Sequence, residues 1–195
     1  MNNFEKRTMK KKEAITMAAL TLFGEQGFST VSIKTIAAAA QVSQVSIYNY
    51  FGNKEALVLE CAKHIMVETL TLADEILAEE EPFHVKIEKA LNLCNQQLNL
   101  SLSSYLTKEA AADVSFTNLL FKDINALKKE MYMKYIHLGK QEHALPDISD
   151  ETIQLFIDAL NSISLSISEE EMTLRQTEII HLFLYGLMGE KKQTR

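Results

Sequence analysis

VSIKTIAAAAQVSQVSIYNYFGNKEAL, residues 31–57, has the pattern of two short helices joined by a tight turn. The hydroxyl of Ser32 is suited to cap the first helix, because it can accept a hydrogen bond from an unpaired backbone N–H of the opening turn. The small side chains of residues 37–40 keep this helix thin, so that a second helix can pack closely against it at a steep angle. The stretch therefore predicts a helix-turn-helix unit.

The second helix of this unit is predicted from its N-cap, Ser43, to about Asn49. Gln41 lies in the turn, where the backbone usually adopts a left-handed conformation that costs a residue other than glycine about 1 kcal/mol. Ile47 is the clear inward anchor. The outward side chains carry donors, acceptors and a flat ring, which suit a DNA major groove. They are Gln44, Val45, Ser46, Tyr48 and Asn49.

Each of these outward side chains has a plausible DNA partner. Gln44 and Asn49 can pair with base edges, and Val45 can contact a thymine methyl group. Ser46 and Tyr48 can reach bases or phosphate oxygens. On a short helix the same residue types are often solvated surface only, and that alternative stays open here.

Three parts of the sequence together resemble the TetR family of bacterial transcriptional repressors. They are the end of the first helix, EQGF at residues 25–28, the unit above, and YNYFGNKEAL at residues 48–57. The resemblance covers roughly the first 57 residues; beyond them it is one of length and helical pattern only. Gln41 departs from the family, which prefers glycine there. The resemblance implies DNA-facing side chains on the second helix and phosphate contacts just after it. We count as DNA-binding candidates Ser32, Ser43, Gln44, Val45, Ser46, Tyr48, Asn49, Tyr50 and Lys54.

Tyr50 and Lys54 are the residues to which the resemblance gives the phosphate role. Lys54 follows the cap residue Asn53 at the start of the next helix, where its charge and the helix N-terminus both favour an anion. Tyr50 and its neighbour Phe51 could also be core aromatics, and for Phe51 the core is the preferred interpretation.

Length and composition predict an all-α protein of about nine helices. The 195 residues include only six glycines and two prolines, and long periodic segments show no strand-like alternation. We expect a helix-turn-helix DNA-binding domain at residues 1–54, whose fold is a three-helix unit. Residues 55–195 are expected to form a helical ligand-binding and dimerisation domain.

Charge is divided unevenly between these two parts. Residues 1–54 carry seven basic and three acidic residues, a balance of +4, whereas the remainder carries a balance of −10. A cationic N-terminal unit on an acidic body suits DNA binding, because phosphate neutralisation supplies most non-specific affinity. The basic run 10–12 could also be no more than a solvated tail.

The remaining helices follow from hydrophobic periodicity and from start and stop signals. The helix after Asn53 should continue to about Ala78, and Gly139 is expected to stop the longest later helix. The other predicted ranges are 8–26 for the first helix, then 82–104, 107–114, 115–140, 149–168 and 172–188, with a loop at 141–150.

The last two predicted helices carry the most apolar surface, which predicts a homodimer with a four-helix interface. The resemblance implies the same, since the family dimerises through its final helices. The alternative is that these apolar stripes only complete the core of the monomer.

Residues for catalysis, a cofactor or a metal are not recognisable in this sequence. It has no Gly-rich phosphate loop, GxSxG or HExxH pattern, and its five histidines are scattered. Cys61 and Cys94 look like buried thiols of a reducing cytoplasm. Because neither a signal peptide nor a run of membrane-spanning length is evident, we expect a cytoplasmic protein without a membrane partner.

The body is therefore expected to bind rather than to catalyse. Its aromatic residues either pack the core, which is the default, or line a largely apolar cavity between helices. They are Phe83, Tyr105, Phe116, Phe121, Tyr132 and Tyr135, together with Met131. The resemblance implies a small-molecule effector in such a pocket but identifies neither the effector nor the lining residues.

The sequence predicts a dimeric repressor that binds a pseudo-palindromic operator in double-stranded DNA and is released by a small molecule. A helical ligand-binding or scaffolding protein without DNA binding is the alternative. An enzyme on a helical body is a further class, for which no residue cluster argues.

Overall fold

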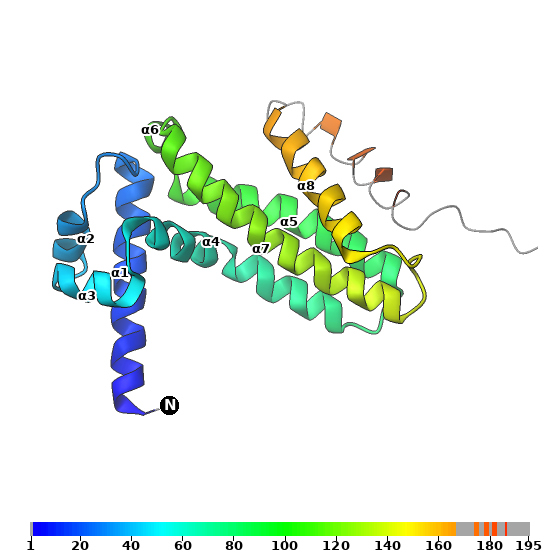
Figure 1. Cartoon of the computed structure of the whole chain (residues 1–195), viewed down its shortest axis with the longest axis horizontal. Coiled ribbons are helices and arrows are strands. Elements are labelled where there is room, and N and C mark those ends of the chain that lie inside the picture. The colour runs from blue at the N-terminus through cyan, green and yellow to red at the C-terminus, as the bar shows by residue number, and fades with distance from the viewer. Residues whose placement is uncertain (1, 167–173, 176–177, 180, 183–185, 187–195) are drawn as a thin grey trace, which may run out of the picture. The chain divides into compact units, whose positions relative to one another are not determined.

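Eight α-helices and no strand occur in the residues that the computed structural model describes, which are 2–166, 174–175, 178–179, 181–182 and 186 (Figure 1). The all-α prediction is confirmed. The predicted last helix, 172–188, lies largely outside the described residues. The helices are α1 Asn3–Gln26, α2 Ile33–Ala39, α3 Gln44–Phe51, α4 Lys54–Ala78, α5 Phe83–Tyr105, α6 Lys108–Ala111, α7 Val114–Gln141 and α8 Asp150–Ser166.

Helix α1 begins at Asn3, five residues before the predicted start at Thr8. The reason is a capping box, in which the Asn2 side chain accepts a hydrogen bond from the Glu5 N–H and the Glu5 carboxylate accepts one from the Asn2 N–H, both at 2.8 Å. The helix ends at Gln26, and its C-cap, Gly27, has the positive φ of 79° expected of a glycine that terminates a helix.

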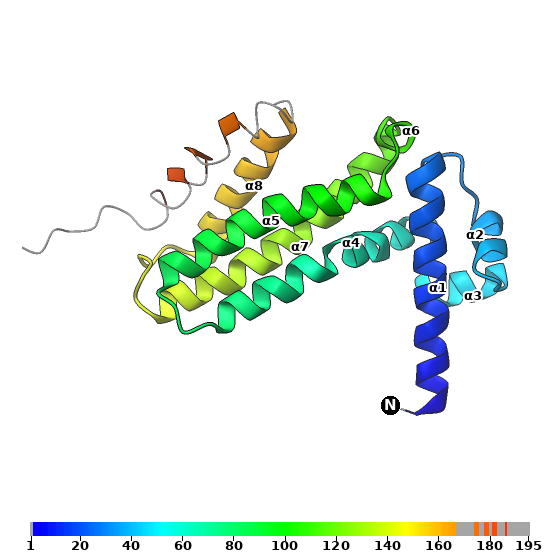
Figure 2. The same ribbon diagram turned by 180° about the vertical axis from the view of Figure 1, so that it is seen from behind.

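The helix-turn-helix formed by α2 and α3 confirms the predicted caps. Ser32 and Ser43 are the two N-caps, each accepting a hydrogen bond from the backbone N–H three residues later at 3.1 Å. Gln41 has a φ of 55°, the left-handed conformation expected for the turn. Ile36 and Ile47 are buried, and α2 contacts both α1 and α3 (Figure 2).

The chain forms two compact units. One consists of residues 1–68 and 96–127, and the other of residues 69–95 and 128–195. Helices α4, α5 and α7 therefore contribute to both units. The domain boundary expected at residue 54 separates a DNA-binding domain from a ligand-binding domain, and it stays a prediction.

The core of the second unit is built from α4, α5, α7 and α8. Phe83, Met131, Tyr132 and Tyr135 are buried in it, and the Tyr135 hydroxyl donates a hydrogen bond to the Ala73 carbonyl at 2.5 Å. These four members of the aromatic set thus pack as core residues.

Gly139 lies inside α7 and does not stop it, so this part of the prediction was wrong. A Cβ at this position would lie 2.7 Å from the Phe83 ring and 2.9 Å from the Leu145 side chain, so glycine is required for packing rather than for termination. The helix continues to Gln141, and a left-handed residue, His143 at a φ of 55°, follows in the turn.

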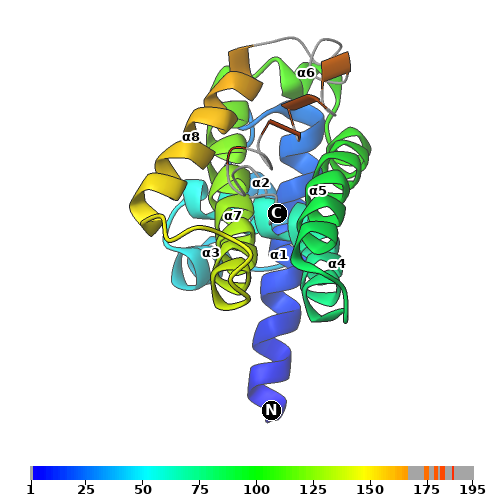
Figure 3. The same cartoon turned by 90° about the vertical axis from the view of Figure 1, so that its right-hand side faces the viewer.

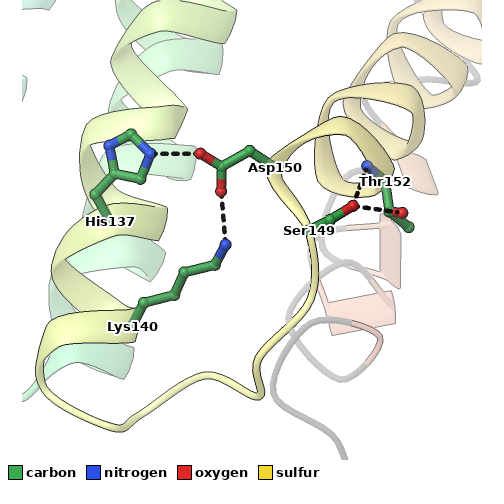
Figure 4. A network of polar contacts seen from close by, with 5 residues as sticks. All are labelled: His137, Lys140, Ser149, Asp150 and Thr152. Carbon is green, nitrogen blue, oxygen red and sulfur yellow. Dashed lines mark hydrogen bonds and ion pairs between the residues drawn. The ribbon is translucent and has the colours of Figure 1, made fainter.

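Helix α8 lies beside the second half of α7 (Figure 3). Asp150, the first residue of α8, accepts hydrogen bonds from two α7 side chains, His137 at 2.9 Å and Lys140 at 2.6 Å (Figure 4). Beside it, the Ser149 hydroxyl accepts a hydrogen bond from the Thr152 N–H at 3.3 Å, which caps the helix. These side chains fix where α8 begins.

Candidate nucleic-acid interface

Helix α3 presents an exposed polar face, as the sequence predicts. Gln44, Val45, Tyr48 and Asn49 are exposed, with 65% of Val45 and 51% of Tyr48 accessible to solvent. Ile47 is only 1% exposed and anchors the opposite side of the helix. The side chains of Val45 and Tyr48 are therefore available to contact a partner molecule.

Ser43 and Ser46 are bonded to each other on this helix. The Ser43 hydroxyl accepts the Ser46 N–H, and the two hydroxyl oxygens are 2.9 Å apart. At the start of α2, Ser32 has the same arrangement with Thr35, whose hydroxyl oxygen lies 2.8 Å from that of Ser32. These serines therefore first position the helices, and sequence reasoning missed Thr35, which shares the cap of α2.

Tyr50 lies at the end of α3 and is partly exposed. The Lys12 ammonium, from α1, lies 5.9 Å from the centroid of its ring, a distance that allows a cation–π contact. The Phe51 ring lies edge-on to it with 6.4 Å between the centroids. The structure thus places one lysine of the basic run 10–12 next to a predicted phosphate contact, and no spacing along the chain indicates this proximity.

Lys54 is turned toward the loop between α1 and α2. Its ammonium donates a hydrogen bond to the Phe28 carbonyl and lies 4.0 Å from the centroid of the Phe28 ring. Partial burial lowers the pKa of Lys54, while the nearby carboxylates of Glu55 and Asp113 act to raise it. The side chain therefore has a partner inside the protein, and two of its three N–H donors remain for other ligands.

Helix α6 supports this region by contacting the end of α1 (Figure 2). The N–H and the hydroxyl of Thr107, the N-cap of α6, both donate to the Gly24 carbonyl, at 2.9 and 3.0 Å. A Cβ on Gly24 would overlap the carbonyl oxygen of Tyr105, so only glycine allows this approach. The contact joins residues more than 80 positions apart in the chain, and no local sequence signal reveals it.

Metal sites and membrane spans are both absent from the described residues. Within the part of the chain that the structure describes, no group of three His, Cys, Asp or Glu side chains could hold a metal ion. None of the described helices is long and apolar enough to cross a membrane.

Residues 15–61 match the family model described as bacterial regulatory proteins, tetR family. This segment contains the second half of α1, all of α2 and α3, and the start of α4. It therefore includes every DNA-binding candidate named from the sequence.

Curated relatives also match the N-terminal part. The chain is 31% identical over 84 residues to YhgD of Bacillus subtilis, described as an uncharacterized HTH-type transcriptional regulator, and the match covers 43% of this chain and 44% of YhgD. It is 25% identical over 138 residues to KstR2 of Rhodococcus jostii, an HTH-type transcriptional repressor, covering 68% of this chain and 66% of KstR2. Both matches span less than two thirds of the relative.

Solved structures share the fold over most of the chain. A TetR-family structure from Syntrophomonas wolfei has a TM-score of 0.61 at 21% identity, and the match covers 94% of this chain and 99% of the Syntrophomonas chain. A transcriptional regulator from Cytophaga hutchinsonii has a TM-score of 0.57 at 17% identity, covering 90% and 97%. At these identities the likeness concerns the fold alone.

Proposed function

We propose that this chain, as a member of the TetR family of bacterial regulatory proteins, is a transcriptional repressor and binds double-stranded DNA through α3. The observation that carries the proposal is the exposed face of α3, held out by the buried anchor Ile47. The net charge of +4 over residues 1–54 supports it, because a cationic surface is attracted to the phosphate backbone.

The candidate residues divide into two groups by their chemistry. Gln44 and Asn49 would read base edges, and Val45 would contact a thymine methyl group. Phosphate contacts would come from Tyr50 and Lys54, and Lys54 would make one with the donors that Phe28 leaves available. The hydroxyls of Ser32, Ser43, Ser46 and Tyr48 complete the proposed interface.

The repressor would act as a homodimer through its C-terminal helices. In α8, 71% of Leu155 is accessible to solvent, so a large apolar side chain lies on the surface of this helix. A second copy of the same helix could cover it. Two α3 helices would then occupy successive major grooves of a pseudo-palindromic operator, with half-sites about 34–36 Å apart.

Release from DNA would follow the binding of a small molecule in the domain at residues 55–195. Such a ligand shifts the equilibrium only if it binds one arrangement of the dimer better than the other. We propose that the favoured arrangement has a separation of the two α3 helices that no longer matches the half-sites. KstR2, which is named a repressor, supports this direction of regulation.

Selection of bound fragments from sheared genomic DNA, followed by sequencing, tests the proposal. We expect enrichment of short fragments that share an inverted repeat. Gel-shift titration of one enriched fragment and of a scrambled duplex should show tighter binding to the former, with an affinity that falls as salt rises. Absence of retardation with either duplex at low salt would favour a ligand-binding protein without DNA binding.

A further inference from the structure

A single peptide group in the loop between α1 and α2 is held from both ends by opposite charges. Its carbonyl, that of Phe28, accepts a hydrogen bond from the Lys54 ammonium at the start of α4. Its N–H, that of Ser29, donates to the Asp113 carboxylate at 2.8 Å. Hydrogen bonds to charged groups are stronger than those between neutral groups, so this peptide is a well-held point of the loop.

Asp113 is rigidly placed, because its carboxylate has a second role. It is the residue directly before α7, and its Oδ1 accepts a hydrogen bond from the Phe116 N–H at 3.0 Å, which is an N-cap. Oδ2 is the oxygen that accepts the Ser29 N–H. One carboxylate thus joins the start of α7 to the loop, across 84 positions of sequence.

The loop is shaped to admit this carboxylate. Gly27 has a φ of 79°, and a Cβ added there would lie 2.9 Å from Oδ2 of Asp113. The bonds donated by the Ser29 and Phe116 N–H groups lower the pKa of Asp113, so the group is ionised at neutral pH. Glycine at position 27 therefore serves the approach of Asp113 as well as the end of α1.

We propose that Asp113 is a positioning residue for DNA binding, which acts by holding the Phe28–Ser29 peptide and thereby the start of α2. This inference rests on the proposed function. Ser32, the N-cap of α2, follows Ser29 by three residues, so the loop leaves little slack between the held peptide and the helix-turn-helix. Without the bond to Asp113, the pair of helices would sample more orientations, and fewer of them would fit a major groove.

Asp113→Asn is the matched substitution for a test. Its amide oxygen can still cap α7 by accepting a hydrogen bond from the Phe116 N–H. Its NH2 group would then face the Ser29 N–H, and these two groups cannot bond because both are donors. We expect the affinity for an operator fragment from the genomic selection to fall about tenfold, as loss of a charge-assisted hydrogen bond implies. The salt slope of binding should stay unchanged, because Asp113 contacts no phosphate.

Two further variants separate positioning from general effects. Glu109→Gln removes an exposed charge on the adjacent helix α6 and should leave the affinity unchanged. Gly27→Ala would place a methyl group against the same carboxylate and should reduce the affinity for the operator fragment in the same way. NMR of protein with 15N-labelled serine reports directly on the contact: the Ser29 amide signal should shift and exchange faster in Asp113→Asn, with the helical circular dichroism retained.

The outcomes distinguish this inference from the proposed function. If the wild-type protein binds neither the operator fragment nor a random duplex, the proposed function fails. If the wild type binds and both Asp113→Asn and Gly27→Ala bind equally well, the positioning role of Asp113 is wrong. An unshifted Ser29 amide in Asp113→Asn would also overturn it, whatever the affinity.

Discussion

The ammonium of Lys54 lies 4.0 Å from the centroid of the Phe28 ring and 5.8 Å from that of Phe23. It thus rests against two aromatic side chains of the α1 end and the loop after it, with a hydrogen bond to the Phe28 carbonyl. The partial loss of water around it is the cause of its lowered pKa. A residue expected to contact DNA from the surface therefore also joins the start of α4 to the end of α1 and the loop that follows it.

Replacing Lys54 tests both of its roles. Lys54→Ala should weaken binding to every DNA sequence alike and reduce the salt slope by about 1, as expected when one ammonium–phosphate pair is removed. Lys54→Arg, which keeps charge and donors, is the matched control and should retain the slope. The measurement is a gel-shift or anisotropy titration over a range of salt concentrations. Weaker binding by Lys54→Ala with an unchanged slope would leave Lys54 only its structural role.

Gln44→Ala should relax sequence preference rather than remove binding. Its side chain is exposed on α3 and is proposed to pair with a base edge, which is worth about 1–3 kcal/mol of discrimination. We expect weaker binding to the operator fragment and little change on a random duplex. Tyr50→Ala, at a proposed phosphate contact, should instead weaken both. An equal reduction on both duplexes for both variants would contradict the division into base and phosphate contacts.

Gly24→Ala should destabilise the protein, although alanine normally favours a helix over glycine by about 0.8–1 kcal/mol. The added methyl group would overlap the Tyr105 carbonyl, and overpacking of this kind costs about 1–3 kcal/mol. Urea denaturation followed by circular dichroism measures the free energy of unfolding. A variant more stable than the wild type would show that α1 and the end of α5 are not in this close contact.

Acid should weaken the attachment of α8 to α7. Hydrogen bonds from Lys140 and His137 lower the pKa of Asp150 from its ordinary 3.8. A carboxyl with a depressed pKa stabilises the fold above its ordinary pKa, and this contribution disappears as the pH falls through the depressed value.

Asp150→Asn, which cannot ionise at this position, makes the test specific. The difference in the free energy of unfolding between the wild type and this variant should be present above the ordinary carboxyl pKa of 3.8 and vanish in strong acid. Because the pair is exposed to solvent, added salt should also reduce the difference. A difference that persists unchanged in strong acid would contradict the assignment.

Leu155→Glu should convert the proposed dimer into a monomer. The residue is 71% exposed on α8, and a carboxylate there would have to be buried against the second copy. Leu155→Ala removes apolar surface without adding charge, and it should shift the equilibrium less. Sedimentation velocity over a range of protein concentrations measures the association. A wild-type protein that sediments as a monomer at every concentration would remove the basis for the paired α3 helices.

Helix caps, turns and the buried side of a short helix depend on residues that are close together in the sequence. The hydroxyls of Ser32 and Ser43 cap helices because a cap involves only the next three residues. Gln41 adopts the expected left-handed turn, and Ile47 is buried where its helical spacing puts it. The all-α class and the exposed face of α3 follow from such short-range signals, so the amino-acid sequence by itself predicts them.

Contacts between distant segments are decided by the tertiary structure. Gly139 has the pattern of a helix stop but is a packing site for Phe83, and Lys54 has the pattern of a surface residue but rests on Phe28. Asp113 carries no local sign that its carboxylate reaches Ser29. A sequence specifies which conformations each short segment prefers, whereas the partner of a side chain depends on which segments meet in space, and only the folded chain brings those segments together.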